Sequence, residues 1–556
     1  MITAIEIENF KAIGERVRVE LKPLTLLFGP NSAGKSSIIH ALLLGHEIFE
    51  RHNLDPDRTV LGGDAVDLGG FKNFVHGHND SVPVRLRFEF ALADGALSMG
   101  RHEDNILWPS INEEWAEAID QRLKGCTSAW VEIEVVGGLI VRQYEAGLEG
   151  GVVAQVRMTP ALEPELYHLN FSHLLLRDSG FEDLFKAVVK EEFADRRTDL
   201  KIPFGGQVEH RLGILSVLPR WDEAVMLDAF RKDADLGESI CLTFALTELI
   251  ARPGEILRDE LRKLRYLGPL REMPPRDYKP PRYPDNARWA RGLAAWEELY
   301  QAGERVVEEA GESAEKEPTV AESAADEWGD AGSAPAEPEG EEGNRLSLDE
   351  VNEWLGGDRL DAGYRVDRKR RTEIDLGAIP ASDADPDELK RFVQELRKRD
   401  TKEHIVLVPH GQSIQVQLHD VGTGVSQLLP VVVLSLAARD NLVAIEQPEL
   451  HLHPALQTEL GDLFIESALR SFRKNTLLIE THSEHLILRL LRRIRETTEP
   501  TQNENARPLR PDQVSVIYVE QTEQGVQLSQ LRIDESGEFI DRWPKGFFEE
   551  RADELF

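Results

Sequence analysis

Residues Leu24 to Ser37 read LTLLFGPNSAGKSS, an apolar run that passes directly into a glycine-rich segment. Gly29 to Ser37 fits the pattern G-x-x-x-x-G-K-[ST], and the apolar run before it is typical of a buried strand. Ser36 to Phe49 then carries apolar residues at helical spacing. This order of strand, loop and helix predicts a phosphate-binding loop, in which backbone N–H groups and a helix N-terminus hold an anion.

The spacing assigns a role to each side chain of the loop. Lys35 is expected to reach the β and γ phosphates of a nucleotide, and Ser36 to hold Mg²⁺. A glycine-rich turn with a chance lysine is the alternative, but it does not account for the strand and helix on either side. The predicted ATP-binding residues are Gly29, Asn31, Ser32, Ala33, Gly34, Lys35, Ser36 and Ser37.

A second motif stands far along the chain, where Leu442 to Pro454 reads LVAIEQPELHLHP. Four apolar residues that end in an acid and a proline-broken turn are typical of a Walker B strand. Glu446 is then the second candidate ligand for Mg²⁺, beside Ser36. Two motifs in this order point to an ATPase.

Two further segments flank the Walker B strand: HDVGTGVSQLLPVVVLSLA from His419 to Ala437, and NTLLIETHSEHLILRL from Asn475 to Leu490. With the motifs above, they resemble the ATP-binding cassette ATPases, and more narrowly the overcoming-lysogenization-defect (OLD) family and its relatives in bacterial anti-phage defence. The resemblance covers about the first ninety and the last hundred and fifty residues. It implies an α/β fold, a cassette-type P-loop ATPase head with a mixed sheet.

The same resemblance implies a split site in a dimer or higher oligomer. One protomer holds ATP with its phosphate loop, its Walker B acid and the switch histidine His482, while the signature turn of a second protomer closes over the γ phosphate. The signature candidates are Gly422, Thr423, Gly424, Ser426 and Gln427. A helix N-terminus capped by Thr423 or Ser426 is compatible with that role.

The chain departs from the cassette pattern where a catalytic glutamate usually follows the metal-binding acid, because Gln447 stands there. An amide cannot act as a general base. Three accounts stay open: Glu449 orients the attacking water, Gln447 does so as the glutamine of some GTPases does, or hydrolysis is slow and ATP is mainly a dimerisation ligand. We favour Glu449, whose alternative is a surface carboxylate at a helix start. The candidate catalytic residues are thus Glu449, Gln447, His482 and Lys35.

Other charged residues carry weaker signals. His451 and His453 suggest a metal site, but no cysteine stands nearby, and the segment lies where a cassette ATPase has its D-loop. Arg271, in a glycine- and proline-containing segment from Tyr266 to Tyr278, is either an inward-pointing charge or a solvated loop residue. Basic clusters near Arg365, Lys390 and Arg489 are compatible with nucleic acid, but acids are interleaved with each, which favours solvated helix faces.

Composition sets the remaining expectations. The chain has 556 residues, 41% of them hydrophobic, two cysteines and a formal net charge of −35. No apolar stretch approaches the roughly 20 residues of a membrane helix, so we expect no membrane partner and a cytoplasmic location. Between Gln301 and Glu350, 16 acidic residues stand against three basic ones with almost no large apolar side chains, which predicts a disordered acidic linker.

The predicted domain organisation follows. The ATPase domain comprises residues 1–95 and 401–500; residues 96–300 form an inserted lobe, strand-rich from Trp130 to Met158 and helical from about Glu163 to Leu264. The linker spans 301–350, and a helical segment of the insertion spans 351–400. Residues 501–556 are a capping segment with a strand at Val514 to Val519 and packing aromatic residues, which are Phe539, Trp543, Phe547 and Phe548.

OLD nucleases carry a Toprim domain, whose D-x-D pair does not occur after His482 here. We therefore expect an ATPase that acts as the sensor and scaffold subunit of an anti-phage complex such as a Septu-like system. Its partner would be a separate effector, an HNH-type nuclease being one candidate. The alternatives are an ATP-locked scaffold with little turnover, and a RecF-like repair ATPase that clamps DNA.

Overall fold

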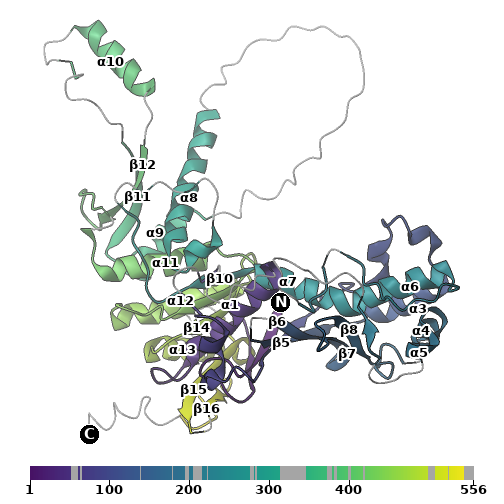
Figure 1. Cartoon of the computed structure of the whole chain (residues 1–556). Helices are drawn as coiled ribbons and strands as arrows, with labels where there is room; N and C mark the ends of the chain where they lie inside the picture. The colour runs from purple at the N-terminus through teal and green to yellow at the C-terminus, as the bar shows by residue number, and fades with distance from the viewer. Residues whose placement is uncertain are drawn as a thin grey trace, which may run out of the picture.

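The structure of the chain is a computed structural model that describes residues 1–51, 61–62, 66–137, 140–177, 179–194, 200–204, 216–221, 223–275, 278, 281, 285–312, 346–371, 379–380, 385–398, 402–417, 420–498, 508–523 and 525–543. Two large sheets organise it (Figure 1). The fold is α/β with mixed sheets, as the motifs predict. No described helix is both long enough and apolar enough to cross a membrane.

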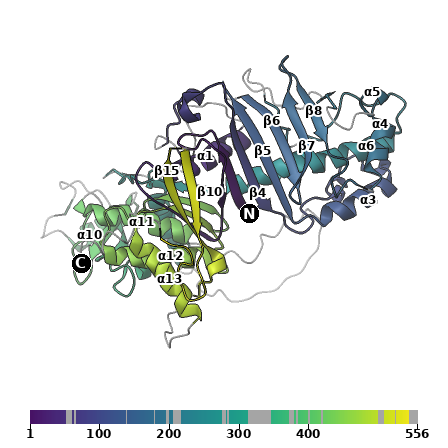
Figure 2. The same ribbon diagram turned by 90° about the horizontal axis from the view of Figure 1, so that it is seen from below.

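The first large sheet has eight strands in the order β2-β1-β4-β5-β6-β7-β8-β9 and is antiparallel throughout. Figure 2 shows the strands fanned out beside the second sheet. Its strands are β1 (Ile2–Glu8), β2 (Val17–Glu20), β4 (Val84–Ala91), β5 (Ser128–Val136), β6 (Ile140–Leu148), β7 (Gly151–Met158), β8 (Pro164–Leu169) and β9 (Ile202–Pro203).

This sheet changes the expected picture of the insertion in two ways. The strands after Ala91 continue the sheet that β1 and β4 begin, so the meander shares a core with the start of the chain. The helical expectation is wrong at Pro164–Leu169, which forms β8 against β7. Leu166 and Leu169 are buried there, and the open edge of β7 supplies the hydrogen-bond partners that a short apolar run cannot find by itself.

The second large sheet has the order β10-β13-β14-β3-β15-β16, with the first five strands parallel and β16 antiparallel. It brings together segments from both ends of the chain. Its strands are β3 (Leu24–Phe28), β10 (Leu264–Leu267), β13 (Leu442–Glu446), β14 (Thr476–Glu480), β15 (Val514–Thr522) and β16 (Gly525–Leu531).

Both faces of the parallel sheet are buried, which explains why its strands read as continuous apolar runs. Alternate residues point to opposite sides: Leu27, Ala444 and Leu478 belong to the core shared with the antiparallel sheet. Leu26, Val443 and Leu477 belong to a second core. The helices α1 (Lys35–Arg51), α6 (Leu236–Leu246) and α7 (Arg252–Arg262) contribute to the first core; α8 (Leu293–Glu312), α9 (Leu348–Leu355), α11 (Thr423–Ala437), α12 (Pro454–Leu469) and α13 (Glu484–Thr498) contribute to the second.

α3 (Glu113–Lys124), α4 (Phe181–Val188) and α5 (Glu191–Ala194) lie beside the antiparallel sheet in Figure 2. α2 (Phe71–Phe74) contributes Phe71 and Phe74 to the first core. The antiparallel pair β11 (Tyr364–Arg371) and β12 (Lys402–Pro409) carries α10 (Pro386–Lys398) away from both large sheets (Figure 1). α8 continues to Glu312, so the start of the expected linker is helical. Residues 313–345 of that linker lie outside the described residues.

The C-terminal aromatic residues pack as expected where the structure describes them. Trp543 stacks on Phe28 with ring centroids 5.2 Å apart, and Phe539 lies 4.7 Å from Trp543. Because Phe28 is the last residue of β3, this cluster supports the strand end from which the glycine-rich loop departs. Phe547 and Phe548 lie outside the described residues.

Candidate functional site

The glycine-rich loop joins β3 to α1 and has a left-handed backbone at three positions: Gly29 (φ 142°), Ser32 (φ 61°) and Gly34 (φ 102°). A Cβ at Gly29 would overlap the carbonyl oxygen of Val519, and one at Gly34 would lie 2.8 Å from Val526 Cγ2. The two motif glycines are therefore required by the close approach of β15 and β16 as well as by φ. Along the loop, Asn31 and Ser32 are exposed, while Ala33, Lys35 and Ser37 are buried.

Lys35 opens α1 and folds back over the loop. Its Nζ donates to the carbonyl oxygens of Gly29 (3.1 Å) and Pro30 (2.8 Å). Burial lowers the pKa of this ammonium, and the negative charges of Glu480, Glu449 and Glu446 act against that shift. The lysine is thus a buried cation that faces several carboxylates. Its N–H groups donate to carbonyl oxygens, and phosphate oxygens would replace those acceptors when a nucleotide binds.

Two carboxylates stand side by side at the carboxyl edge of the parallel sheet. Glu446 ends β13 and Glu480 ends β14, and the two are paired in register. Ser36 Oγ donates to Glu480 Oε2 at 2.7 Å. Burial and the charge of Glu446 raise the pKa of Glu480 to about 7, while the Ser36 hydroxyl bond and the charge of Lys35 act against that shift. Glu480 was not among the predicted site residues.

Gln447 follows Glu446 with a left-handed backbone (φ 46°), and its backbone N–H donates to the carbonyl oxygen of Glu480 at 2.8 Å. The residue that stands in place of the usual catalytic glutamate is therefore joined to the strand end of a neighbouring acid through its backbone.

A polar network lies behind Glu446. Tyr266 donates its hydroxyl to Glu446 Oε1 at 2.8 Å, and His40 Nε2 lies 3.5 Å from the same oxygen. Lys11 Nζ is 2.6 Å from His40 Nδ1. Burial lowers the pKa of Lys11 to about 8, against the charges of Glu446 and Asp67. None of these three partners stands in a motif, and only the fold brings β10, α1 and the turn after β1 to one place.

Glu449, the favoured water-orienting residue, has both carboxylate oxygens engaged. Thr481 Oγ1 donates to Oε2 at 2.8 Å and the backbone N–H of His482 donates to Oε1 at 2.6 Å. Burial raises the pKa of this carboxyl. Glu449 is thus no surface carboxylate at a helix start, because it holds the turn that carries His482.

His482 emerges after β14, as predicted for a switch histidine. Its Nε2 is buried and has no hydrogen-bond partner among the described residues. Burial and the charge of Lys35 lower the pKa of the imidazole, so the ring is neutral at pH 7. A buried ring nitrogen without a partner beside a buried lysine fits a γ-phosphate oxygen as the missing partner.

The signature candidates begin α11. Gly422 is the N-cap and makes no side-chain cap; Ser426 Oγ instead donates to the Thr423 carbonyl oxygen at 2.8 Å, so neither Thr423 nor Ser426 caps the helix. Gly422 and Thr423 are exposed, Gly424 is half-buried and Ser426 is buried. An exposed turn of this kind is available to a second protomer.

Gln427 turns inward to Arg271. Its side-chain amide donates to the Arg271 carbonyl oxygen at 2.8 Å, and Arg271 Nη2 donates to the carbonyl oxygen of Glu446 at 2.8 Å and that of Gln447 at 3.3 Å. Arg271 is 5% exposed, and burial lowers its pKa to about 10. The solvated interpretation of this arginine is wrong: it joins the start of α11 to the turn after β13.

The residues present fit Mg²⁺ that arrives with a nucleotide. Ser36 supplies a hydroxyl, and Glu446 and Glu480 supply carboxylates. The described parts of the chain contain no group of three His, Cys, Asp or Glu side chains arranged to hold a metal alone. Mg²⁺ that is bound together with phosphates usually takes one or two carboxylates from the protein and keeps several waters. At such a site the protein supplies only a few of the metal's oxygen ligands. His453 caps α12 through Nδ1, which accepts from Ala455 N.

The basic cluster after His482 is neutralised within the fold. Arg489 and Arg493 pair with Asp462, and Arg492 pairs with Glu496. This pairing favours the interpretation of the cluster as structural ion pairs over a nucleic-acid surface.

Comparison with known proteins agrees with this geometry. Residues 1–107 and 365–487 match the family model of an AAA ATPase domain in two stretches. Residues 509–556 match a family described as a protein of unknown function (DUF3696). No curated protein matches the chain significantly.

Solved structures of SMC heads are similar at low identity. The SMC head bound to the C-winged helix domain of ScpA has 11% identity and a TM-score of 0.36, over 96% of this chain and 98% of that one. An SMC head domain with an extended coiled coil bound to the C-terminal domain of ScpA, from Pyrococcus furiosus, has 11% identity and a TM-score of 0.35, over 100% and 98%. The SMC head domain from Thermotoga maritima has 10% identity and a TM-score of 0.31, over 96% and 99%.

Proposed function

We propose that this protein binds and hydrolyses ATP with Mg²⁺ at the edge of the parallel sheet where Lys35 and Ser36 meet Glu446, Glu480 and His482. The observation that carries the proposal is the buried Nε2 of His482, which has no hydrogen-bond partner among the described residues and lies near Lys35. The loop that precedes Lys35 contains Gly29 and Gly34, where a side chain would collide with β15 or β16. These groups belong to separate segments of the matched ATPase domain, and a triphosphate with its metal would complete their bonds.

Each residue has a role in phosphoanhydride hydrolysis. Lys35 leaves the carbonyls of Gly29 and Pro30 and binds the β and γ phosphates, where it stabilises the charge that develops in the transition state. Mg²⁺ neutralises phosphate charge when bound. His482, held by the contact between its backbone N–H and Glu449, donates a hydrogen bond from Nε2–H to a γ-phosphate oxygen. The exposed turn at Gly422 and Thr423 completes the site of a second protomer.

The test is steady-state ATP hydrolysis by the full chain, with Lys35→Ala and, as a matched control, Lys186→Ala on the exposed face of α4, where the lysine pairs with Glu182. We expect hydrolysis in the native chain and the control, and loss in Lys35→Ala. Equal rates in all three proteins would refute the site. Gel filtration with and without ATP tests the second protomer, because ATP should increase the apparent mass.

A second candidate function is an ATP-locked scaffold with little turnover. Two observations favour it: Gln447 cannot take a proton, and both oxygens of Glu449 already accept hydrogen bonds. A water-orienting role for Glu449 requires one of those donors to give way to water. Tight ATP binding by the native chain with no hydrolysis, combined with ATP-dependent dimerisation, would establish the scaffold.

We further propose that the ATPase is the sensor and scaffold subunit of a bacterial anti-phage complex that controls a separate effector, a nuclease of the HNH type being one candidate. Support comes from the motif resemblance at Gly422 to Gln427, Glu446 to His453 and Glu480 to Leu486. The check is plating of a phage panel on cells that carry the gene with its neighbours, native or Lys35→Ala. Equal plating on both would exclude the defence role.

A further inference from the structure

Glu480 is the carboxylate in direct contact with the hydroxyl that should hold the metal. Ser36 Oγ donates to Glu480 Oε2 at 2.7 Å, whereas Glu446 Oε1 is engaged by Tyr266 and faces His40. A serine hydroxyl that donates its proton to a carboxylate has its lone pairs free for a cation. The Ser36 hydroxyl is therefore already oriented as a metal ligand by Glu480.

We propose that Glu480 is a third protein group of the metal site: with Ser36 and Glu446 it holds the divalent cation that accompanies the nucleotide. This inference rests on the proposed function. Glu480 is 3% exposed and Glu446 is 5% exposed, and the two end adjacent strands in register. Carboxylates at two adjacent strand ends, one of them in contact with the Ser36 hydroxyl, are oxygen ligands of the kind that Mg²⁺ takes.

This arrangement offers a physical reason for a glutamine at position 447. Its backbone N–H donates to the Glu480 carbonyl oxygen at 2.8 Å, which places its side chain beside the ends of β13 and β14. A glutamate at this position would add a further acid beside Glu446 and Glu480. The glutamine therefore adds no negative charge at the ends of these two strands.

The experiment compares nucleotide affinity with and without metal. A fluorescent, non-hydrolysable ATP analogue is titrated into the full chain in excess Mg²⁺ and in EDTA, for the native protein and Glu480→Gln. Loss of a residue that orients a metal ligand typically lowers metal affinity by roughly 10–100-fold. We expect the ratio of the two affinities, Mg²⁺ over EDTA, to fall by about that factor in Glu480→Gln while affinity in EDTA stays close to native.

The matched control is Glu248→Gln. Glu248 is 1% exposed, accepts from Ser98 N at 3.0 Å and faces His102, so the control neutralises a buried carboxylate in the lobe of α6 and α7. It should keep the native ratio. A native ratio in Glu480→Gln, an equal fall in Glu248→Gln, or a loss of affinity in EDTA as large as in Mg²⁺ would each overturn the inference.

Failure of the proposed function looks different, because the native chain would then bind no nucleotide in either buffer. If Glu480→Gln does not fold, Glu480→Asp retains the charge on a shorter side chain. Its affinity for Mn²⁺ in the presence of the analogue, measured by electron paramagnetic resonance, should fall below the native affinity. Equal Mn²⁺ affinity in the two proteins would overturn the inference.

Discussion

Replacing Gln447 by glutamate should weaken the nucleotide-free protein, although it restores the residue that cassette ATPases usually have. The change adds a carboxylate beside two others that are almost fully buried. Two unit charges about 4 Å apart repel by about 4 kcal/mol at an effective dielectric constant of about 20.

Carboxylates in contact relieve most of that repulsion by sharing a proton. We therefore expect Gln447→Glu to lower the free energy of unfolding by about 3 kcal/mol near pH 8 and by about half as much near pH 6, where the pair retains its proton. The assay is urea unfolding without nucleotide at the two pH values, followed by Mg²⁺-dependent ATP hydrolysis. Turnover should not exceed the native rate.

The control for the added charge is Gln394→Glu, on the exposed face of α10, which should leave stability and turnover unchanged. The reasoning would be refuted by a Gln447→Glu protein as stable as the native chain that also hydrolyses ATP at least tenfold faster. That result would mean that position 447 is the place of a general base and that a further charge beside Glu446 and Glu480 costs no stability.

Three further results are expected. Gly29→Ala should lower the melting temperature even without nucleotide, because a Cβ there overlaps the Val519 carbonyl oxygen; an unchanged melting curve would contradict the loop geometry. Burial lowers the Lys11 pKa to about 8. Between pH 8 and pH 10.5 the unfolded chain therefore binds more protons than the folded chain, and raising the pH favours the folded state by about 3 kcal/mol. Lys11→Met should abolish this rise in the free energy of unfolding. Equal pH dependence in urea unfolding of both proteins would refute it. Trp543→Ala should lower the free energy of unfolding by about 2–3 kcal/mol, because the contacts with Phe28 and Phe539 are lost. An unchanged thermal unfolding curve would contradict a stabilising role of these ring contacts.

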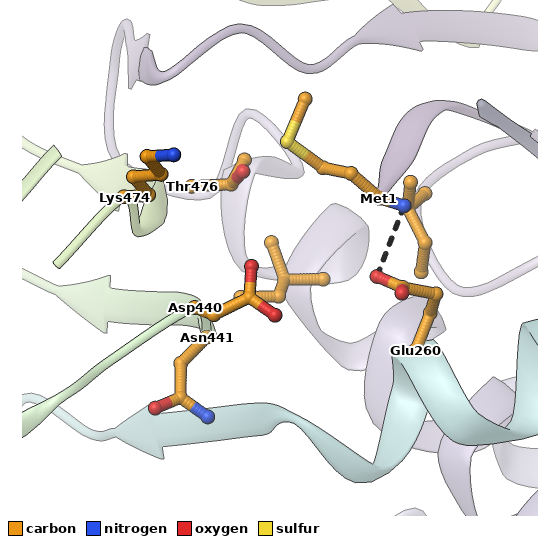
Figure 3. Close-up of a pocket in the computed structure, with 8 residues that line it drawn as sticks. Met1, Glu260, Asp440, Asn441, Lys474 and Thr476 are labelled. Atoms are coloured by element: carbon orange, nitrogen blue, oxygen red, sulfur yellow. Dashed lines mark ion pairs between the residues drawn. The ribbon is translucent and has the colours of Figure 1, made fainter. Parts of the chain in front are cut away.

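The small pocket at the opposite edge of the parallel sheet is a feature that the sequence did not predict (Figure 3). There the amino group of Met1 pairs with Glu260 at 3.1 Å, beside Asp440 and Lys474. No motif marks these residues, and their meeting depends on β1 and α7 lying beside the start of β13. The phosphate loop, by contrast, is local, and its strand and helix lie where the sequence predicts them.

Errors in the sequence-based expectations have the same origin. Pro164–Leu169 is a strand because β7 offers an open edge, and the alternation of the run is too short to show it. Arg271 is buried because carbonyl oxygens of Glu446 and Gln447, far away in the chain, receive its donors. Glu480 could have been noticed as an acid that ends a fully apolar strand, beside the switch histidine.

What the sequence by itself determined is therefore the set of local motifs: the loop at Gly29 to Ser37, the acid-ended strand at Glu446, the turn before α11 and the position of His482. Each is encoded by residues that are neighbours in the chain. Only the tertiary structure decided which acid touches Ser36 and what occupies the oxygens of Glu449. The first contact joins residues 444 positions apart and the others join residues 32 and 33 positions apart, and the register of β3, β13 and β14 brings them to one edge of the sheet.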